Sequence, residues 1–137
     1  MEDKIRSTWW TLRIAYGLVP VVAGLDKFTN LLCDWKGYLA PWFAALLPVS
    51  PTTFMHLVGI IEIAVGLAIL AGLTRIGAYV ASAWLAAIAL NILTSGQHLD
   101  VAVRDLMMAL GALTLGRLSE VVVPERRTAM RPASSTA

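Results

Sequence analysis

Residues 54–73 read FMHLVGIIEIAVGLAILAGL, and this stretch decides the class of the fold. Apart from His56 near its start, Glu62 is its only ionisable residue. A helix rises about 1.5 Å per residue, so roughly 20 residues cross a hydrocarbon layer about 30 Å thick. The stretch has that length and apolar character, and it therefore predicts a transmembrane helix.

Three other segments of similar length are also mainly apolar, namely residues 9–28, 75–94 and 99–118. In a bilayer every backbone N–H and C=O must find a partner within the protein, and a helix provides this within one segment. We therefore expect an all-α integral membrane protein. Its single domain would be a four-helix transmembrane bundle formed by residues 1–123.

The composition of the whole chain agrees with a membrane protein. Of its 137 residues, 58% are hydrophobic and 15% are charged, whereas soluble domains carry about 25% charged residues. The net charge of +2 and the lack of an arginine-rich helix argue against nucleic-acid binding. Lys4 and Arg6 precede the first apolar segment as in a signal peptide, but Arg13 interrupts that segment, so we expect a retained helix.

Two segments outside the predicted helices have distinct compositions. Residues 30–53 hold an apolar run too short to cross a membrane, with several aromatic residues and three prolines. Because aromatic side chains collect at headgroup depth, we expect an interfacial aromatic connector, with an active-site lid as the alternative. Residues 124–137 are rich in Arg, Pro, Ser, Thr and Ala, and we expect a disordered basic cytoplasmic tail.

The positions of lysine and arginine predict the topology. Short loops rich in these residues stay in the cytoplasm. The N-terminal segment, the turn at Arg75 and the C-terminal region are the basic parts of the chain, and an even number of crossings puts them on one side. We therefore expect a multi-pass protein of the cell membrane, surrounded by lipid, with both termini in the cytoplasm.

Glycines repeat at helical spacing in the first two predicted spans. Gly17 and Gly24 share one face of residues 9–28, and Gly59 and Gly66 share one face of residues 54–73. Helices in lipid associate through small residues that let their backbones approach. These faces should therefore point into the bundle.

Six polar residues cluster toward one end of the predicted bundle, and we expect them to line a ligand pocket: Lys27, Glu62, Asn91, Asp100, Arg104 and Asp105. An ionisable group at the membrane centre costs about 2.5–3.5 kcal/mol, so such groups usually pair or face a cavity. The pocket would lie in the outer half of the bundle, under the aromatic connector. Buried ion pairs that only fix the register of the helices are the alternative.

Spacing suggests partners for some of these residues. Glu62 shares a face with Gly59 and Gly66, so it should point inward, where Lys27 or Arg104 could neutralise it. Asp100 and Arg104 are four residues apart, which is the spacing of an ion pair along a helix.

The sequence gives no pattern typical of a metal site. His56 and His98 each begin a predicted helix without the carboxylate spacing of a metal motif, so we interpret them as interfacial residues and expect neither a metal nor haem. Cys33 is the only cysteine, which excludes an internal disulfide and a CxxC redox pair. The cofactor is left open, with a quinone as one possibility.

Four short motifs resemble, in their order and spacing, the DoxX family of small four-helix integral membrane proteins. They are GLDKF at residues 24–28, GIIEIAVG at 59–66, NILTSGQHLD at 91–100 and VRDL at 103–106. The resemblance covers residues 12–118, and the recurrent polar positions of the family correspond to the six residues named above. It implies a redox setting, because the family takes its name from the small subunit of a thiosulfate:quinone oxidoreductase.

This resemblance favours a membrane subunit or partner of a redox complex that offers a quinone or another small molecule a polar pocket. Any enzymatic role would then be that of an accessory subunit of a membrane oxidoreductase. A non-enzymatic scaffold that recruits a soluble oxidoreductase and a small transporter subunit are the alternatives. The sequence leaves the partner and a homo-oligomeric state open.

Overall fold

The computed structural model describes residues 1–129, with side chains described as far as residue 123. Every regular element in this range is helical, which confirms the all-α prediction. The elements are α1 (Glu2–Thr29), the short 3-10 helix η1 (Trp35–Tyr38), α2 (Pro41–Leu46), α3 (Pro51–Ala71), α4 (Thr74–Ser95) and α5 (Leu99–Ala129).

The first and last helices are longer than their apolar segments predict. Helix α1 begins at Glu2, because acidic residues in a first turn interact favourably with the helix dipole. Helix α5 continues to Ala129, past the predicted domain boundary at residue 123. The remainder of the predicted tail, 130–137, lies outside the described residues.

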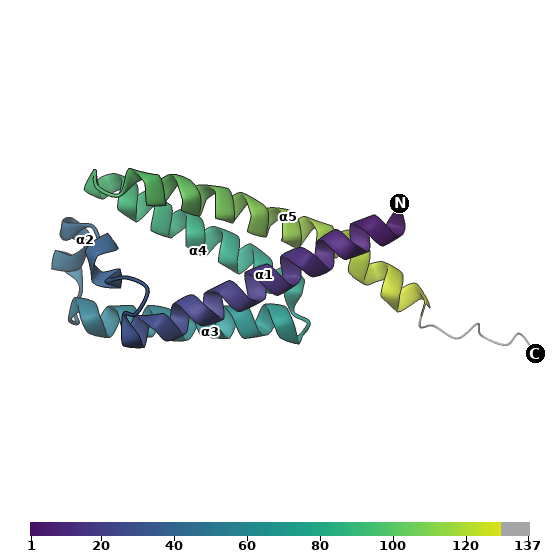
Figure 1. Cartoon of the computed structure of the whole chain (residues 1–137), viewed down its shortest axis with the longest axis horizontal. Helices are drawn as coiled ribbons and strands as arrows, with labels where there is room; N and C mark the ends of the chain where they lie inside the picture. Colours follow the sequence, from purple (N-terminus) through teal and green to yellow (C-terminus); the bar gives the residue numbers. More distant parts are fainter. Residues whose placement is uncertain (130–137) are drawn as a thin grey trace, which may run out of the picture.

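Within the described residues, three helices are long and apolar enough to cross a membrane, namely Pro51–Ala71, Thr74–Ser95 and Leu99–Val123. Helix α1, which carries Arg13, Asp26 and Lys27, is not among them. It nevertheless runs alongside α3 (Figure 1). Hydropathy therefore supports three of the predicted crossings, and the fourth is supported by the packing of α1.

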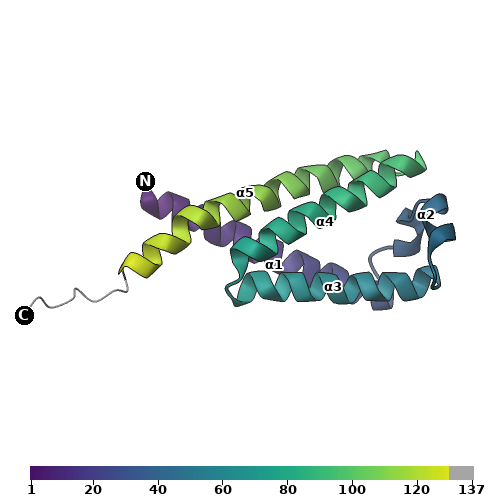
Figure 2. The same cartoon turned by 180° about the vertical axis from the view of Figure 1, so that it is seen from behind.

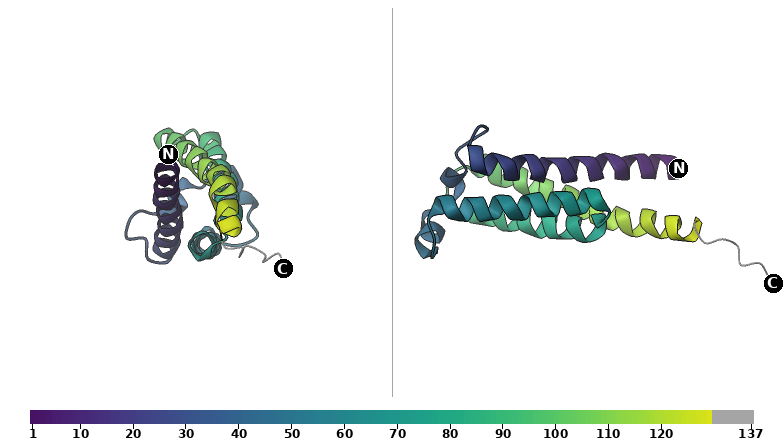
Figure 3. Two further views of the ribbon diagram at one scale, coloured as in Figure 1. Left: turned by 90° about the vertical axis from the view of Figure 1, so that its right-hand side faces the viewer. Right: turned by 90° about the horizontal axis from the view of Figure 1, so that it is seen from below.

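The long helices form two antiparallel pairs, α1 with α3 and α4 with α5 (Figure 1). The pairs meet at the end that carries the N terminus and separate toward the other end, where α2 lies (Figure 2). Viewed from below, α1 and α5 both extend beyond the turn between α3 and α4 (Figure 3). The chain thus has a closed end and an open end.

Glycines hold α1 and α3 together, as the sequence predicts. A Cβ atom built on Gly24 would lie 2.5 Å from the carbonyl oxygen of Gly59, and one built on Gly59 would lie 2.6 Å from that of Gly24. About two helical turns toward the closed end, a Cβ on Gly66 would lie 2.5 Å from the carbonyl oxygen of Gly17. The two backbones are therefore in direct contact at two levels, a distance that only glycine permits.

The closed end contains the main apolar core, which is formed by Trp9, Ile69, Ala78, Ala81, Ala112, Leu115 and Val122. The buried indole of Trp9 donates a hydrogen bond to Ser119 Oγ, with 2.7 Å between the two atoms. Arg13 donates to the carbonyl oxygens of Ile69 and Leu70 at 3.1 and 2.6 Å. Because these carbonyls belong to the last turn of α3, the guanidinium satisfies acceptors that a helix end leaves without partners.

The outer surfaces of all four long helices are apolar. Leu18, Leu57, Ile76 and Leu110 are each at least half exposed, one on each helix. Water would not favour such a surface, whereas lipid does. The chain is thus a multi-pass membrane protein in contact with the bilayer.

Candidate functional site

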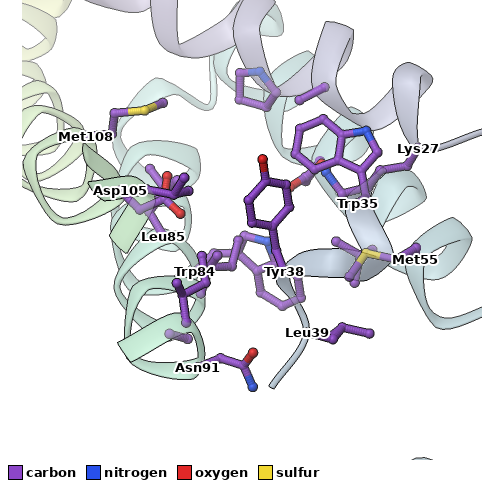
Figure 4. A pocket seen from close by; sticks show the side chains of 18 of the residues that line it. Lys27, Trp35, Tyr38, Leu39, Met55, Trp84, Leu85, Asn91, Asp105 and Met108 are labelled. Carbon is purple, nitrogen blue, oxygen red and sulfur yellow. The ribbon is translucent and has the colours of Figure 1, made fainter. Parts of the chain in front are cut away.

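A cavity of about 920 Å³ separates the two helix pairs at the open end. Ligand pockets in proteins commonly measure about 300–1,000 Å³. All four long helices and the connector contribute to its lining, which includes the aromatic residues Tyr16, Trp35, Tyr38, Trp42, Phe43, Phe54 and Trp84. Figure 4 shows Trp35, Tyr38 and Trp84 around the space. The structure thus has room for a molecule inside the bundle.

An ion pair on the α1 and α3 side of the cavity joins Lys27 and Glu62. Lys27 Nζ lies 2.6 Å from Glu62 Oε2, and the two side chains are 4% and 11% exposed. Glu62 is the twelfth residue of α3, so the pair lies about 16 Å along that helix by its rise. Lys27 and Arg104 were the two partners predicted for Glu62, and Lys27 is the one that pairs with it.

Asp26 fastens the connector to the end of α1. Its carboxylate accepts hydrogen bonds from the backbone N–H groups of Leu31 and Leu32 and from the indole of Trp35, the last at 2.8 Å. The Trp35 ring then lies over Lys27, with 3.7 Å between the ammonium nitrogen and the ring centroid. Asp26 therefore sets the position of an aromatic ring that covers the buried lysine.

The connector reaches the other helix pair through α4. Asn91 Oδ1 accepts a hydrogen bond from the backbone N–H of Ala40 at 3.0 Å, and the Trp42 indole donates to Thr94 Oγ1 at 2.9 Å. Tyr38 meets the ring of His98 edge to face, with 4.8 Å between centroids. The connector thus spans the two pairs across the open end and forms a roof over the cavity.

The three predicted residues of α5 have different surroundings. Arg104 and Asp100 form the expected ion pair at 2.8 Å, but their side chains are 69% and 73% exposed. Arg104 and Asp105 line the cavity, whereas Asp100 does not. Asp100 lies one turn before Arg104 at the start of α5 and points outward, so the expectation that it lines the cavity was wrong.

Five of the six predicted site residues therefore surround one cavity: Lys27, Glu62, Asn91, Arg104 and Asp105. Sequence reasoning missed Asp26, Trp35 and Trp84. The acidic residue next to Lys27, at the end of the first apolar segment, was the signal that could have identified Asp26. Trp35 belongs to the aromatic connector that was expected to cover the pocket, and Trp84 lies at helical spacing from Gly77 and Ala81, on the face of residues 75–94 that was expected to point inward.

Trp84 on α4 presents an unusual polar group. Its indole Nε1 is buried near the Glu62 carboxylate, yet within the described part of the chain it donates no hydrogen bond of normal geometry. A buried donor without an acceptor costs about 1–3 kcal/mol. A buried donor of this kind needs an explanation, and an acceptor supplied by a bound molecule is one.

The histidines contact aromatic rings. His56 stacks on Phe28 with 4.8 Å between centroids, and His98 contacts Tyr38. Among residues whose side chains are described, no three His, Cys, Asp or Glu come together as a metal site requires. The aromatic and apolar lining of the cavity is what suits an organic molecule.

Comparison with protein families matches residues 8–95 to the DoxX family. The match spans more than half of the chain. This protein belongs to the DoxX family. Comparisons with curated proteins and with solved structures found no match.

The DoxX match extends from α1 through α4 and therefore includes Lys27, Glu62 and Asn91. Helix α5, with Arg104 and Asp105, lies beyond it. The buried ion pair and the Asn91 anchor of the roof thus belong to the part of the chain that is shared with the family.

Proposed function

We propose that this DoxX-family protein is a membrane subunit or partner of a redox complex, and that its cavity holds the ring of a quinone. The observation that carries the proposal is the indole N–H of Trp84, which is buried in the wall of a large cavity beside the Lys27–Glu62 pair and makes no hydrogen bond of normal geometry within the described residues. The resemblance to the DoxX family supplies the redox setting.

The chemistry of the cavity suits a quinone, which is a flat apolar ring with two carbonyl acceptors. The Trp84 N–H and the Lys27 ammonium are donors available to such an oxygen. The rings of Trp35 and Tyr38 offer faces and edges against which a flat ring packs favourably. Apolar residues nearer the middle of the bundle, including Val65 and Leu85, would contact the rest of the molecule.

Glu62 would handle a proton in this scheme. A quinone takes up two electrons and two protons when it becomes a quinol, and the electrons would come from the partner oxidoreductase. A carboxylate within hydrogen-bond reach of the reacting oxygen can give or accept such a proton. Lys27, which holds Glu62 at 2.6 Å, would fix the position of that carboxylate.

The test is whether the protein retains a quinone when purified in native lipid. We expect extraction and mass spectrometry to find an isoprenoid quinone bound to the wild-type protein above the amount in protein-free lipid. A Trp84→Phe variant keeps a ring but loses the donor, and its quinone affinity should fall about tenfold, the effect of one hydrogen bond.

Trp10→Phe is the matched control, because Trp10 does not line the cavity and the substitution is the same. Its quinone affinity should equal that of the wild type. Wild-type protein without quinone, or equal affinity in the Trp84→Phe and Trp10→Phe variants, would contradict the proposal.

A further inference from the structure

Four acidic or basic side chains line the cavity, namely Lys27, Glu62, Arg104 and Asp105, and one of them has no ion-pair partner among the described side chains. Lys27 and Glu62 neutralise each other within the wall, and Arg104 is paired with Asp100 outside it. Asp105 is the charged group that remains. Within the described side chains it takes part in no ion pair and no hydrogen bond.

No cation among the described side chains lies within ion-pair distance of Asp105. Lys27 on α1 and Arg104 on α5 attract its carboxylate through space, but neither comes within ion-pair distance. Glu62 on α3 repels it. The Tyr16 hydroxyl, which also lines the cavity, donates its hydrogen bond to the carbonyl oxygen of Met108 instead.

Asp105 also lies inside the apolar part of the chain. It is the seventh residue of α5, about 9 Å from the start of that helix by its rise. A carboxylate at such a depth is costly without a partner and in membrane proteins usually marks a ligand or ion site. Figure 4 shows Asp105 on one side of the cavity and Lys27 with Trp35 on the other.

Aromatic rings complete the surroundings of this carboxylate. The faces of tryptophan and tyrosine rings attract cations, and aromatic cages bind quaternary ammonium ligands in this way. One such cation–π contact already exists in the cavity wall, where Lys27 Nζ lies 3.7 Å from the centre of the Trp35 ring. The rings of Tyr38 and Trp84 line the same cavity.

We propose that the cavity binds lipophilic organic cations, with Asp105 as their counter-ion and the surrounding tryptophan and tyrosine rings as their cage. The ligand class is an ammonium or phosphonium centre on an apolar body that reaches the site from the membrane. This activity is independent of quinone binding, because a neutral quinone needs a donor such as the Trp84 N–H, whereas a cation needs the carboxylate.

Two probes of nearly the same shape and opposite charge test the proposal, namely tetraphenylphosphonium and tetraphenylborate. We expect the purified full-length protein in detergent to bind the phosphonium at least about tenfold more tightly, as the loss of one charge-assisted contact implies. Equal affinities would show that the cavity selects only for apolar bulk, and tighter binding of the borate would show the opposite charge preference. Either result overturns the proposal.

Variants identify the carboxylate. Asp105→Asn should lower phosphonium affinity about tenfold, and Asp105→Glu should retain it. Asp34→Asn is the matched control, because it is the same substitution at an exposed residue outside the cavity, and it should bind as the wild type does. Quinone retention by Asp105→Asn, measured on the same sample, distinguishes this proposal from the preceding one and reports a folded cavity.

Two results of this series would overturn the assignment. One is unchanged phosphonium binding by Asp105→Asn, and the other is equal loss in Asp105→Asn and Asp34→Asn. If Asp105→Asn does not fold, the two probes on the wild-type protein still decide the preference for cations. Phosphonium that protects tryptophan fluorescence from a quencher in the wild-type protein, but not in a variant with Trp35→Phe and Trp84→Phe, then lies in the cavity.

Discussion

Lys27 of α1 and Glu62 of α3 hold each other at 2.6 Å inside the protein, where neither side chain is more than 11% exposed. Removing one partner from such a pair leaves a buried charge without compensation, whereas replacing both by apolar residues is often neutral. Variants of this pair can therefore show whether the buried charges stabilise the protein or take part in its function.

We predict that Glu62→Gln lowers the free energy of unfolding by about 3–5 kcal/mol because it leaves the Lys27 charge unpaired. The double variant Lys27→Met, Glu62→Leu should recover most of that loss. Reversible unfolding in mixed micelles measures both. A double variant as unstable as Glu62→Gln would contradict this reasoning. A stable double variant that no longer retains quinone would show that the pair serves quinone binding and not stability.

A second prediction concerns the contact between Gly24 and Gly59. A methyl group on Gly59 would lie 2.6 Å from the carbonyl oxygen of Gly24, so α1 and α3 must separate. We expect Gly59→Ala to cost about 1–3 kcal/mol of unfolding free energy, the usual range for overpacking. Gly37→Ala is the control, since nothing lies within 4 Å of its added Cβ, and its effect should stay within about 0.5 kcal/mol.

Much of this packing is predictable because it follows from helical periodicity. The spacing of Gly59, Glu62 and Gly66 fixes one face of a helix whatever that helix contacts. Burial of a carboxylate in lipid then requires a partner, which limits the choice to nearby cations. The inward face of α3 is therefore predictable from the spacing within one helix. The pairing of Glu62 is predictable because a buried carboxylate needs a cation nearby.

The remainder depends on contacts between distant parts of the chain. The i,i+4 spacing predicts the Asp100–Arg104 pair, but only the rotation of α5 against α4 decides that Asp100 points outward and Asp105 inward. The bond from Ala40 to Asn91 joins residues 51 positions apart. Nothing local in the sequence indicates such a contact, so the attachment of the roof could not be predicted.

A third prediction follows from the role of Asp26. Asp26→Asn replaces one acceptor oxygen by an amide that donates, and this amide would face the N–H groups of Leu31 and Leu32. We expect backbone hydrogen exchange at residues 31–40 to rise about tenfold, as for the loss of one hydrogen bond, with α4 and α5 unchanged. Asp34→Asn is the control, because the exposed Asp34 makes no capping hydrogen bond. Equal exchange in both variants would mean that Asp26 does not hold the connector.

The single cysteine provides a fourth prediction, which also tests the topology. Cys33 lies in the connector, at the end of the bundle opposite both the N terminus and the described end of α5 (Figure 1). If the termini are cytoplasmic, Cys33 is on the outer side. A membrane-impermeant maleimide should then label it in intact cells, whereas a cysteine introduced at Ser7 should react only after the membrane is permeabilised. The reverse pattern would invert the predicted topology.

The same labelling should depend on pH. Burial and then the nearby Asp26 carboxylate raise the pKa of the Cys33 thiol above its ordinary value, and the thiolate is the form that reacts. At neutral pH Cys33 should therefore react more slowly than an exposed cysteine, and its rate should continue to increase with pH after that of the exposed cysteine has levelled. Asp26→Asn removes a negative charge and loosens the connector, so it should accelerate the reaction at neutral pH. A rate that is unaffected by this substitution would show that neither the Asp26 charge nor its hold on the connector limits the reactivity of Cys33.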